Sequence, residues 1–216
     1  MDTTLRCFEL LKEGDEAGIR RLLETDPAAA DGRDSGGVSL LMQALYRGRR
    51  ELAETIADAK SQLDIFEAAS LGRMEPLTQA AADAGAVAGF STDGFTALHF
   101  ACYFGTAETV RALLKLGAKA DVIARNPMQV MPLHSAASVR NAMAARLLLE
   151  HGAPVNARQQ GGWTPIHAAA QNGDQATIDT LLEHGADSKA INDAGQTPGE
   201  VARGKGHLAI AELLEK

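Results

Sequence analysis

Apolar residues recur along the chain at the spacing of short amphipathic helices. Leucines at helical spacing run through residues 107–116 and again through residues 174–184, and each run is followed by a glycine. Because residues three and four apart share one face of an α-helix, this pattern predicts short helices with one buried face. Glycine directly after the last apolar residue is typical of a helix C-terminus. We therefore expect short helices separated by glycine-containing turns.

A second motif precedes these leucine runs and returns about every 33 residues. It contains a histidine, and its copies are Thr96-Ala97-Leu98-His99, Met131-Pro132-Leu133-His134 and Thr164-Pro165-Ile166-His167, with a shorter copy at Thr197-Pro198. A threonine hydroxyl can cap a helix N-terminus, and proline suits the first helical position because its missing N–H costs nothing there. Gly105 and Gly173 should end this first helix in the left-handed conformation. Each unit is predicted to be a helix, a turn, a second helix and a loop.

The repeat resembles the ankyrin repeat, whose unit of about 33 residues carries a Thr-Pro-Leu-His-x-Ala signature. The match is specific over residues 90–200 and is weaker but in phase upstream. The resemblance implies an all-α, single-domain solenoid of about seven helix-turn-helix units, each followed by a short projecting β-hairpin finger. The expected units are residues 1–35, 36–60, 61–92, 93–127, 128–160, 161–193 and 194–216.

Three departures from the repeat predict local changes. Gly48 and Gly72 are closer together than the repeat requires, so the finger expected near residues 60–63 should be missing. Extra residues at 125–130 should lengthen a later finger. Arg140 stands where the other units have glycine, so the turn between its two helices should differ.

Charge and cysteine content narrow the possible partners and the cellular location. The 28 acidic and 21 basic residues give a net charge of −7 that is spread evenly along the chain. Because nucleic acids and anionic membranes attract basic patches, neither is an expected partner. Cys7 and Cys102 form no Cys-x-x-Cys pair, and the N-terminal segment is charged, so a reducing, cytoplasmic location is predicted. The abundance of alanine and the excess of arginine over lysine favour a bacterial source.

Side chains that could carry chemistry are scattered. Adjacent helices pack about 8–10 Å apart, whereas zinc binds each histidine nitrogen at about 2.0–2.1 Å, so histidines of successive units cannot share one ion. No metal, no cofactor and no catalytic residues are expected. The resemblance implies that His99, His134 and His167 bond the backbone of a neighbouring finger. His151, His184 and His207 are predicted at exposed helix ends.

A solenoid offers a partner its long concave surface, formed here by the fingers and the first helices. Carrying the family's exposed variable positions over to this chain, and adding the long finger, gives the candidate binding residues Tyr46, Arg47, Phe95, Tyr103, Phe104, Met128, Val130, Trp163, Gln171 and Asn172. Five of them are aromatic, as binding hot spots often are, although Phe95 and Trp163 could instead pack at the finger base.

The resulting interpretation is a monomeric, non-catalytic module that binds a partner protein. Two alternatives stay open: an accessory or inhibitory subunit of an enzyme, and an enzyme built on an ankyrin scaffold.

Overall fold

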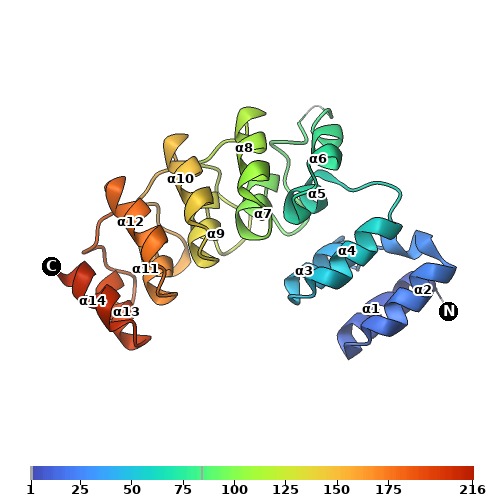
Figure 1. Ribbon diagram of the computed structural model, residues 1–216, viewed down its shortest axis with the longest axis horizontal. Coiled ribbons are helices and arrows are strands. Elements are labelled where there is room, and N and C mark those ends of the chain that lie inside the picture. Colours follow the sequence, from blue (N-terminus) through green and yellow to red (C-terminus); the bar gives the residue numbers. More distant parts are fainter. Residues whose placement is uncertain (1, 84) are drawn as a thin grey trace.

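The computed structural model describes residues 2–83 and 85–216. In this part of the chain fourteen α-helices follow one another as seven pairs and no strand longer than a single bridge is present, which confirms the predicted all-α class (Figure 1). The pairs are α1 (Thr3–Glu13) with α2 (Glu16–Thr25), α3 (Leu40–Tyr46) with α4 (Arg50–Ala59), α5 (Ile65–Leu71) with α6 (Met74–Ala80), α7 (Ala97–Tyr103) with α8 (Ala107–Lys115), α9 (Pro132–Ser138) with α10 (Ala142–Glu150), α11 (Pro165–Gln171) with α12 (Gln175–Glu183), and α13 (Pro198–Gly204) with α14 (Leu208–Glu215). Two short 3₁₀ helices lie between pairs, at η1 (Pro27–Asp31) and η2 (Gln160–Gly162).

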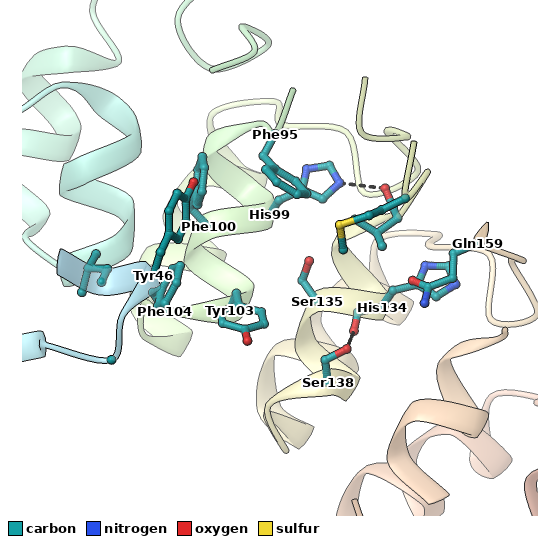
Figure 2. A pocket seen from close by; sticks show the side chains of 14 residues that line it. Tyr46, Phe95, His99, Phe100, Tyr103, Phe104, His134, Ser135, Ser138 and Gln159 are labelled. Carbon is teal, nitrogen blue, oxygen red and sulfur yellow. Dashed lines mark hydrogen bonds between the residues drawn. The ribbon is translucent and has the colours of Figure 1, made fainter. Parts of the chain in front are cut away.

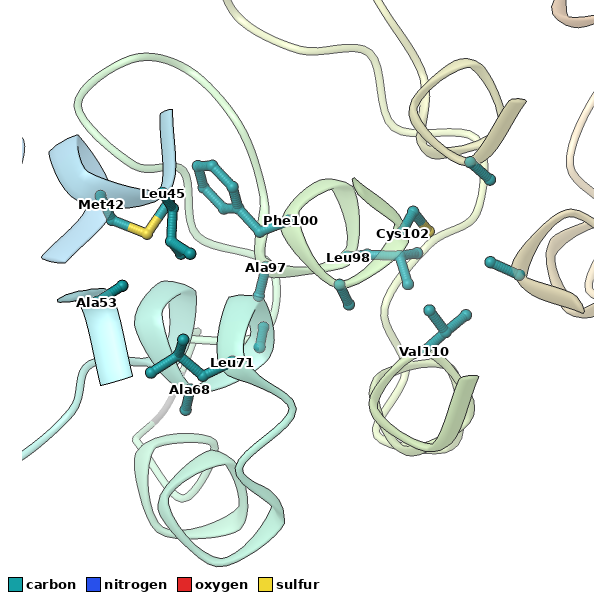
Figure 3. Packing of buried hydrophobic residues seen from close by; sticks show 14 of the residues in the cluster. Met42, Leu45, Ala53, Ala68, Leu71, Ala97, Leu98, Phe100, Cys102 and Val110 are labelled. Atoms are coloured by element: carbon teal, nitrogen blue, oxygen red, sulfur yellow. The ribbon is translucent and has the colours of Figure 1, made fainter. Parts of the chain in front are cut away.

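The pairs stack into an elongated array with the two termini at opposite ends (Figure 1). From α5 onward each first helix packs on the first helix of the next pair, through α7, α9, α11 and α13. Fully buried alanines at equivalent positions allow this close approach, because their side chains end at Cβ; they are Ala69, Ala101, Ala136, Ala169 and Ala202. Larger apolar side chains fill the space between the helix layers (Figure 3).

The turns inside the helix pairs follow the prediction except at Gly105 and at Arg140. Gly173 has φ +68° and adopts the expected left-handed conformation. Gly105 does not have a positive φ, so the prediction for this residue is wrong. A Cβ at position 105 would lie 2.3 Å from the carbonyl oxygen of Ala69 and 2.9 Å from Cα of Ala101. Gly105 is therefore required because two helices approach it closely.

The turn at Arg140 uses the left-handed conformation without a glycine. Arg140 has φ +61°, and its guanidinium donates a hydrogen bond to the carbonyl of Asn172 in the next pair. The turn thus keeps the shape that glycine gives elsewhere, at the cost of backbone strain at an arginine.

Arg140→Gly is expected to stabilise the protein by about 0.5–1 kcal/mol. Relief of left-handed strain raises the free energy of unfolding by about 1–2 kcal/mol. The greater freedom of glycine in the unfolded chain lowers it by about 0.5–1 kcal/mol. Urea unfolding would measure the difference. Arg140→Gln removes the guanidinium but keeps the strain, so it should give no such gain; a gain of equal size in both variants would contradict this account.

The junction between the second and third pairs lacks a finger, as predicted. α4 ends at Ala59 and α5 begins at Ile65. The side chain of Lys60 in this short connection is 4% exposed, and its Nζ lies 3.1 Å from Oδ1 of Asp31 and 3.4 Å from Oε1 of Glu67. Burial raises the pKa of the Glu67 carboxyl. A buried ion pair thus occupies the place where other units project a finger.

The remaining fingers are tight turns. They follow the course of the predicted β-hairpins, but they form no strands in the described part of the chain. Within the described residues the one β-bridge joins Arg33 and Ser39. Elsewhere a backbone hydrogen bond closes each finger, as from Ser91 N–H to Phe95 O (2.8 Å). Successive fingers are also bonded to one another, for example from Arg125 N–H to Gly94 O (2.8 Å). The finger at residues 125–130 carries the predicted extra length as a turn.

Candidate functional site

Three buried histidines join each of three successive pairs to the following finger. Their Nε2 atoms each lie 3.1 Å from a backbone carbonyl oxygen, in the combinations His99 with Val130, His134 with Ala157 and His167 with Gln196. Because a carbonyl only accepts, Nε2 must carry the proton, and each ring is in the neutral Nε2–H form. The structural role implied by the resemblance is confirmed.

The other ring nitrogen of these histidines takes part in capping the first helices together with the threonines. Nδ1 of His99 lies 2.8 Å from the hydroxyl of Thr96 and accepts the backbone N–H of the same residue at 3.2 Å. Thr164 and His167 repeat this arrangement with the same distances. Thr96 and Thr164 are thus the N-cap residues of capping boxes in which the histidine ring accepts the N-cap N–H. The hydroxyl of Thr197 accepts the N–H of Glu200 directly, as predicted.

Burial decides the ionisation of these groups. It lowers the pKa of His99 and of His134 to about 4, and it lowers the pKa of His167 as well. It also raises the pKa of the Cys7 and Cys102 thiols, so neither is prepared as a nucleophilic thiolate. No group of three or more His, Cys, Asp or Glu side chains suited to a metal ion occurs among residues 2–83 and 85–216.

The other three histidines lie at helix ends. The rings of His151 and His184 each bond a carbonyl of the preceding helical turn through Nδ1 at 2.8 Å, as suits the last turn of a helix. His184 differs from the predicted exposure, because it is half-buried. His207 is also half-buried, at the start of α14. Its ring occupies the space beside Gly173, where an added Cβ would lie 2.6 Å from Nδ1.

An apolar hollow of about 440 Å³ opens on the face formed by the fingers and the first helices (Figure 2). Its walls come from α3, α7, α9 and three fingers. Five aromatic side chains contribute to it: Tyr46, Phe95, Phe100, Tyr103 and Phe104. Their rings are in mutual contact, with centroids 4.6–6.5 Å apart. No Asp, Glu, Lys or Arg side chain lines the hollow.

Side chains of α3 and α4 reach the fourth pair across the junction that lacks a finger. The Tyr46 hydroxyl donates a hydrogen bond to the carboxylate of Asp93, which lies on the finger before α7. Arg50 donates to the carbonyl of Phe104 at 2.8 Å and to that of Leu71 at 3.2 Å. These contacts hold the second pair against the fourth and bring Tyr46 beside the aromatic side chains of α7.

Several of the predicted binding residues gather at this hollow. Tyr46, Tyr103 and Met128 line it and are 41%, 47% and 50% exposed. Arg47 follows Tyr46 and is also exposed. These four side chains are positioned where a partner could reach them.

Other predicted residues are placed differently. Val130 also lines the hollow but is 6% exposed, so it forms part of the wall, and its carbonyl accepts a hydrogen bond from His99. Phe95 and Phe104 line the hollow but are partly buried against the core. Trp163 is also partly buried, with its ring 5.6 Å from that of His167.

Gln171 and Asn172 lie outside the hollow, at the end of α11. The side chain of Gln171 is exposed, whereas the Asn172 amide donates to the carbonyl of Ser138 at 2.9 Å. Asn172 therefore has a structural contact with the preceding pair.

Sequence reasoning missed Phe100, whose ring lies at the centre of the aromatic cluster. Its ring contacts Tyr46, Phe66 and Phe95. A signal was present: the residue after the motif histidine is Phe100 here but Ser135 and Ala168 in the next two units. A bulky side chain at a position otherwise occupied by small ones indicates extra space in front of α7.

Comparison with known families agrees with these features. A family model described as ankyrin repeats in three copies matches residues 65–159 and 154–216, which is well over half of the chain. The chain belongs to the ankyrin repeat family. The matched region of this ankyrin repeat protein begins at α5, directly after the junction without a finger. Among curated proteins none matches the chain.

Ankyrin repeat domains generally serve as protein–protein interaction modules and are typically non-catalytic. Within the described part of this ankyrin repeat protein, no helix has the length and hydropathy that a membrane crossing requires.

Proposed function

We propose that this ankyrin repeat protein is a non-catalytic module that binds a partner protein on the face formed by its fingers and first helices. The observation that carries the proposal is the aromatic hollow between α3, α7 and α9, with Tyr46, Tyr103 and Met128 exposed at its edge. Clustered exposed apolar side chains on a soluble domain mark interaction sites, and aromatic anchors supply much of the binding energy. The proposal keeps the cytoplasmic location, the bacterial source and the monomeric state expected from the sequence, with neither nucleic acid nor membrane as a partner.

The predicted residues take different parts in this proposal. Tyr46, Arg47, Tyr103 and Met128 would contact the partner directly, because their side chains are exposed. Phe95 and Phe104 would support the wall of the hollow from their partly buried positions. Three more residues lie further along the same face and would extend the contact: Trp163, Gln171 and Asn172.

Tyr103→Ala combined with Met128→Ala is expected to weaken partner binding by about 2 kcal/mol or more, roughly thirtyfold in affinity, because both side chains are central anchors. The melting temperature should stay within a few degrees, since both side chains are about half exposed. An affinity pulldown from native lysate would identify the partner, and titration of that purified partner would measure the loss.

The matched control replaces exposed apolar residues on second helices and their ends, Leu116→Ala with Met143→Ala, which are 47% and 52% exposed in the native protein. This control should retain the partner with unchanged affinity. If both double variants bind the partner as the native protein does, the binding face lies elsewhere and the proposal is wrong.

A further inference from the structure

Two arginines without carboxylate partners flank the hollow. Arg47 directly follows Tyr46 at the end of α3, and Arg140 lies two residues after Ser138 at the end of α9. The Arg47 guanidinium donates to the backbone carbonyl and side-chain oxygen of Gln43, and the Arg140 guanidinium donates to a backbone carbonyl. Neither guanidinium forms an ion pair within the described chain. Both residues follow the C-terminal ends of first helices that form walls of the hollow, so two positive charges without ion pairs lie near this end, with the Arg140 guanidinium on the side of Asn172.

Most other arginines of the described chain form ion pairs. Arg33 pairs with Asp64 at 2.8 Å and Arg146 with Glu183 at 2.9 Å. Arg47 and Arg140 are among the arginines that have no ion pair in the described chain, together with Arg21, Arg111 and Arg125, although the net charge of the chain is −7.

One acidic side chain beside the hollow, that of Asp93, is engaged at the edge formed by the fingers. Asp93 accepts hydrogen bonds from the Tyr46 hydroxyl through one carboxylate oxygen and from the Ser91 hydroxyl through the other. Its charge is thus stabilised by two donors on the chain itself. The interior of the hollow contains no charged group that could receive a cation.

The hollow offers apolar surface and one free acceptor in its wall. Its volume of about 440 Å³ falls within the range of about 300–1,000 Å³ typical of pockets that enclose most of a ligand. Gln159 lines the hollow, and its side-chain oxygen is buried behind this wall without a hydrogen-bond partner in the described chain. Because an unpaired buried acceptor is costly, a bound group that brings an N–H donor is favoured there. A peptide segment provides such donors along its backbone.

From these features we propose that the hollow receives a segment of the partner protein in which a large apolar side chain, aliphatic or aromatic, stands beside aspartate or glutamate residues. The apolar side chain enters between α3, α7 and α9, and the carboxylates face Arg47 and Arg140. The inference rests on the proposed function and specifies the chemistry of the partner.

Three labelled model peptides would test this chemistry by fluorescence anisotropy. One carries a central Leu-Phe pair flanked by aspartates, the second replaces the aspartates by lysines, and the third replaces Leu-Phe by serines. The first should bind, and its affinity should fall as salt is raised. The lysine peptide should bind at least about tenfold more weakly, because like charges at an interface are strongly disfavoured. The serine peptide should not bind measurably.

Charge variants of the protein provide the second part of the test. Arg47→Gln with Arg140→Gln should weaken the aspartate peptide about tenfold and remove most of its salt dependence. Arg111→Gln, which replaces an exposed arginine on α8, is the matched control and should change neither. Melting curves would verify that each variant is folded.

The outcomes separate this inference from the proposed function. Equal or tighter binding of the lysine peptide, or no binding of the aspartate peptide at millimolar concentration, overturns the inferred chemistry. In that case the pulldown with the Tyr103 and Met128 variant still decides whether this face binds a protein. If that variant loses the partner but the protein does not distinguish the aspartate peptide from the lysine peptide, the inferred chemistry is wrong and the proposed function stands.

Discussion

Gly105→Ala is expected to destabilise the protein by about 3 kcal/mol, although alanine is normally the better residue near a helix. The added Cβ would lie 2.3 Å from the carbonyl oxygen of Ala69 and 2.9 Å from both Cα and the carbonyl oxygen of Ala101. All three are backbone atoms, so α5 and α7 would have to separate where their buried alanines pack. Urea unfolding at neutral pH would measure the loss.

Gly117→Ala is the matched control for this substitution. Gly117 has φ +90°, and a Cβ there would meet no atom within 4 Å. This variant should lose only the cost of a left-handed alanine, about 1–2 kcal/mol. Equal losses at the two positions would show that α5 and α7 can move apart cheaply, and the close-approach explanation for Gly105 would be wrong.

Acid is expected to destabilise the array through its buried histidines. His99 and His134 have a pKa of about 4 in the folded protein, whereas an unfolded histidine has a pKa of about 6.5. The unfolded chain therefore binds more protons below pH 6.5, and stability falls as pH decreases toward 4. Between pH 7 and pH 5 each of the two rings should cost about 2 kcal/mol.

Two other groups affect this pH dependence. The lowered pKa of His167 acts in the same direction as those of His99 and His134. The raised pKa of Glu67 acts in the opposite direction, because the folded state takes up its proton more readily than the unfolded state. With three histidines against one carboxyl, the net effect should be a loss of stability in acid.

His134→Gln would assign the acid effect to a residue. A glutamine amide can still donate toward the carbonyl of Ala157 but does not titrate. Urea unfolding of this variant should show a loss between pH 7 and pH 5 that is smaller by about 2 kcal/mol than in the native protein. A native unfolding free energy that is the same at both pH values would contradict neutral, buried histidines.

Much of the fold could be read from the sequence because each unit repeats the same local signals. The proline and histidine motif predicted where the first helices begin, and the spacing of Gly48 and Gly72 predicted the missing finger. Gly105 could not be understood in this way, since its reason is the carbonyl of Ala69, which belongs to the preceding pair. A local pattern predicts a turn, but it does not show which backbone atoms approach that turn.

The candidate site was predictable only in part, for the same reason. Tyr103 and Met128 occupy exposed positions as expected, whereas Val130 is drawn inward because its carbonyl binds His99. The approach of α3 to α7 depends on the relative position that their helix pairs adopt when a finger is absent from the connection. Register within a repeat indicated which side chains face one surface, but it gave no indication that Tyr46 would meet Phe100.

The bridge from α3 to α7 also affects how the chain folds. The histidine bonds close loops between residues 23 to 31 positions apart, whereas the bonds from Tyr46 to Asp93 and from Arg50 to Phe104 span 47 and 54 positions. Contacts between more distant residues require more chain entropy to be lost before they form. The histidine-linked pairs can assemble by local, nearest-neighbour steps, while the aromatic hollow is completed only when four consecutive pairs, from the second to the fifth, are already in place.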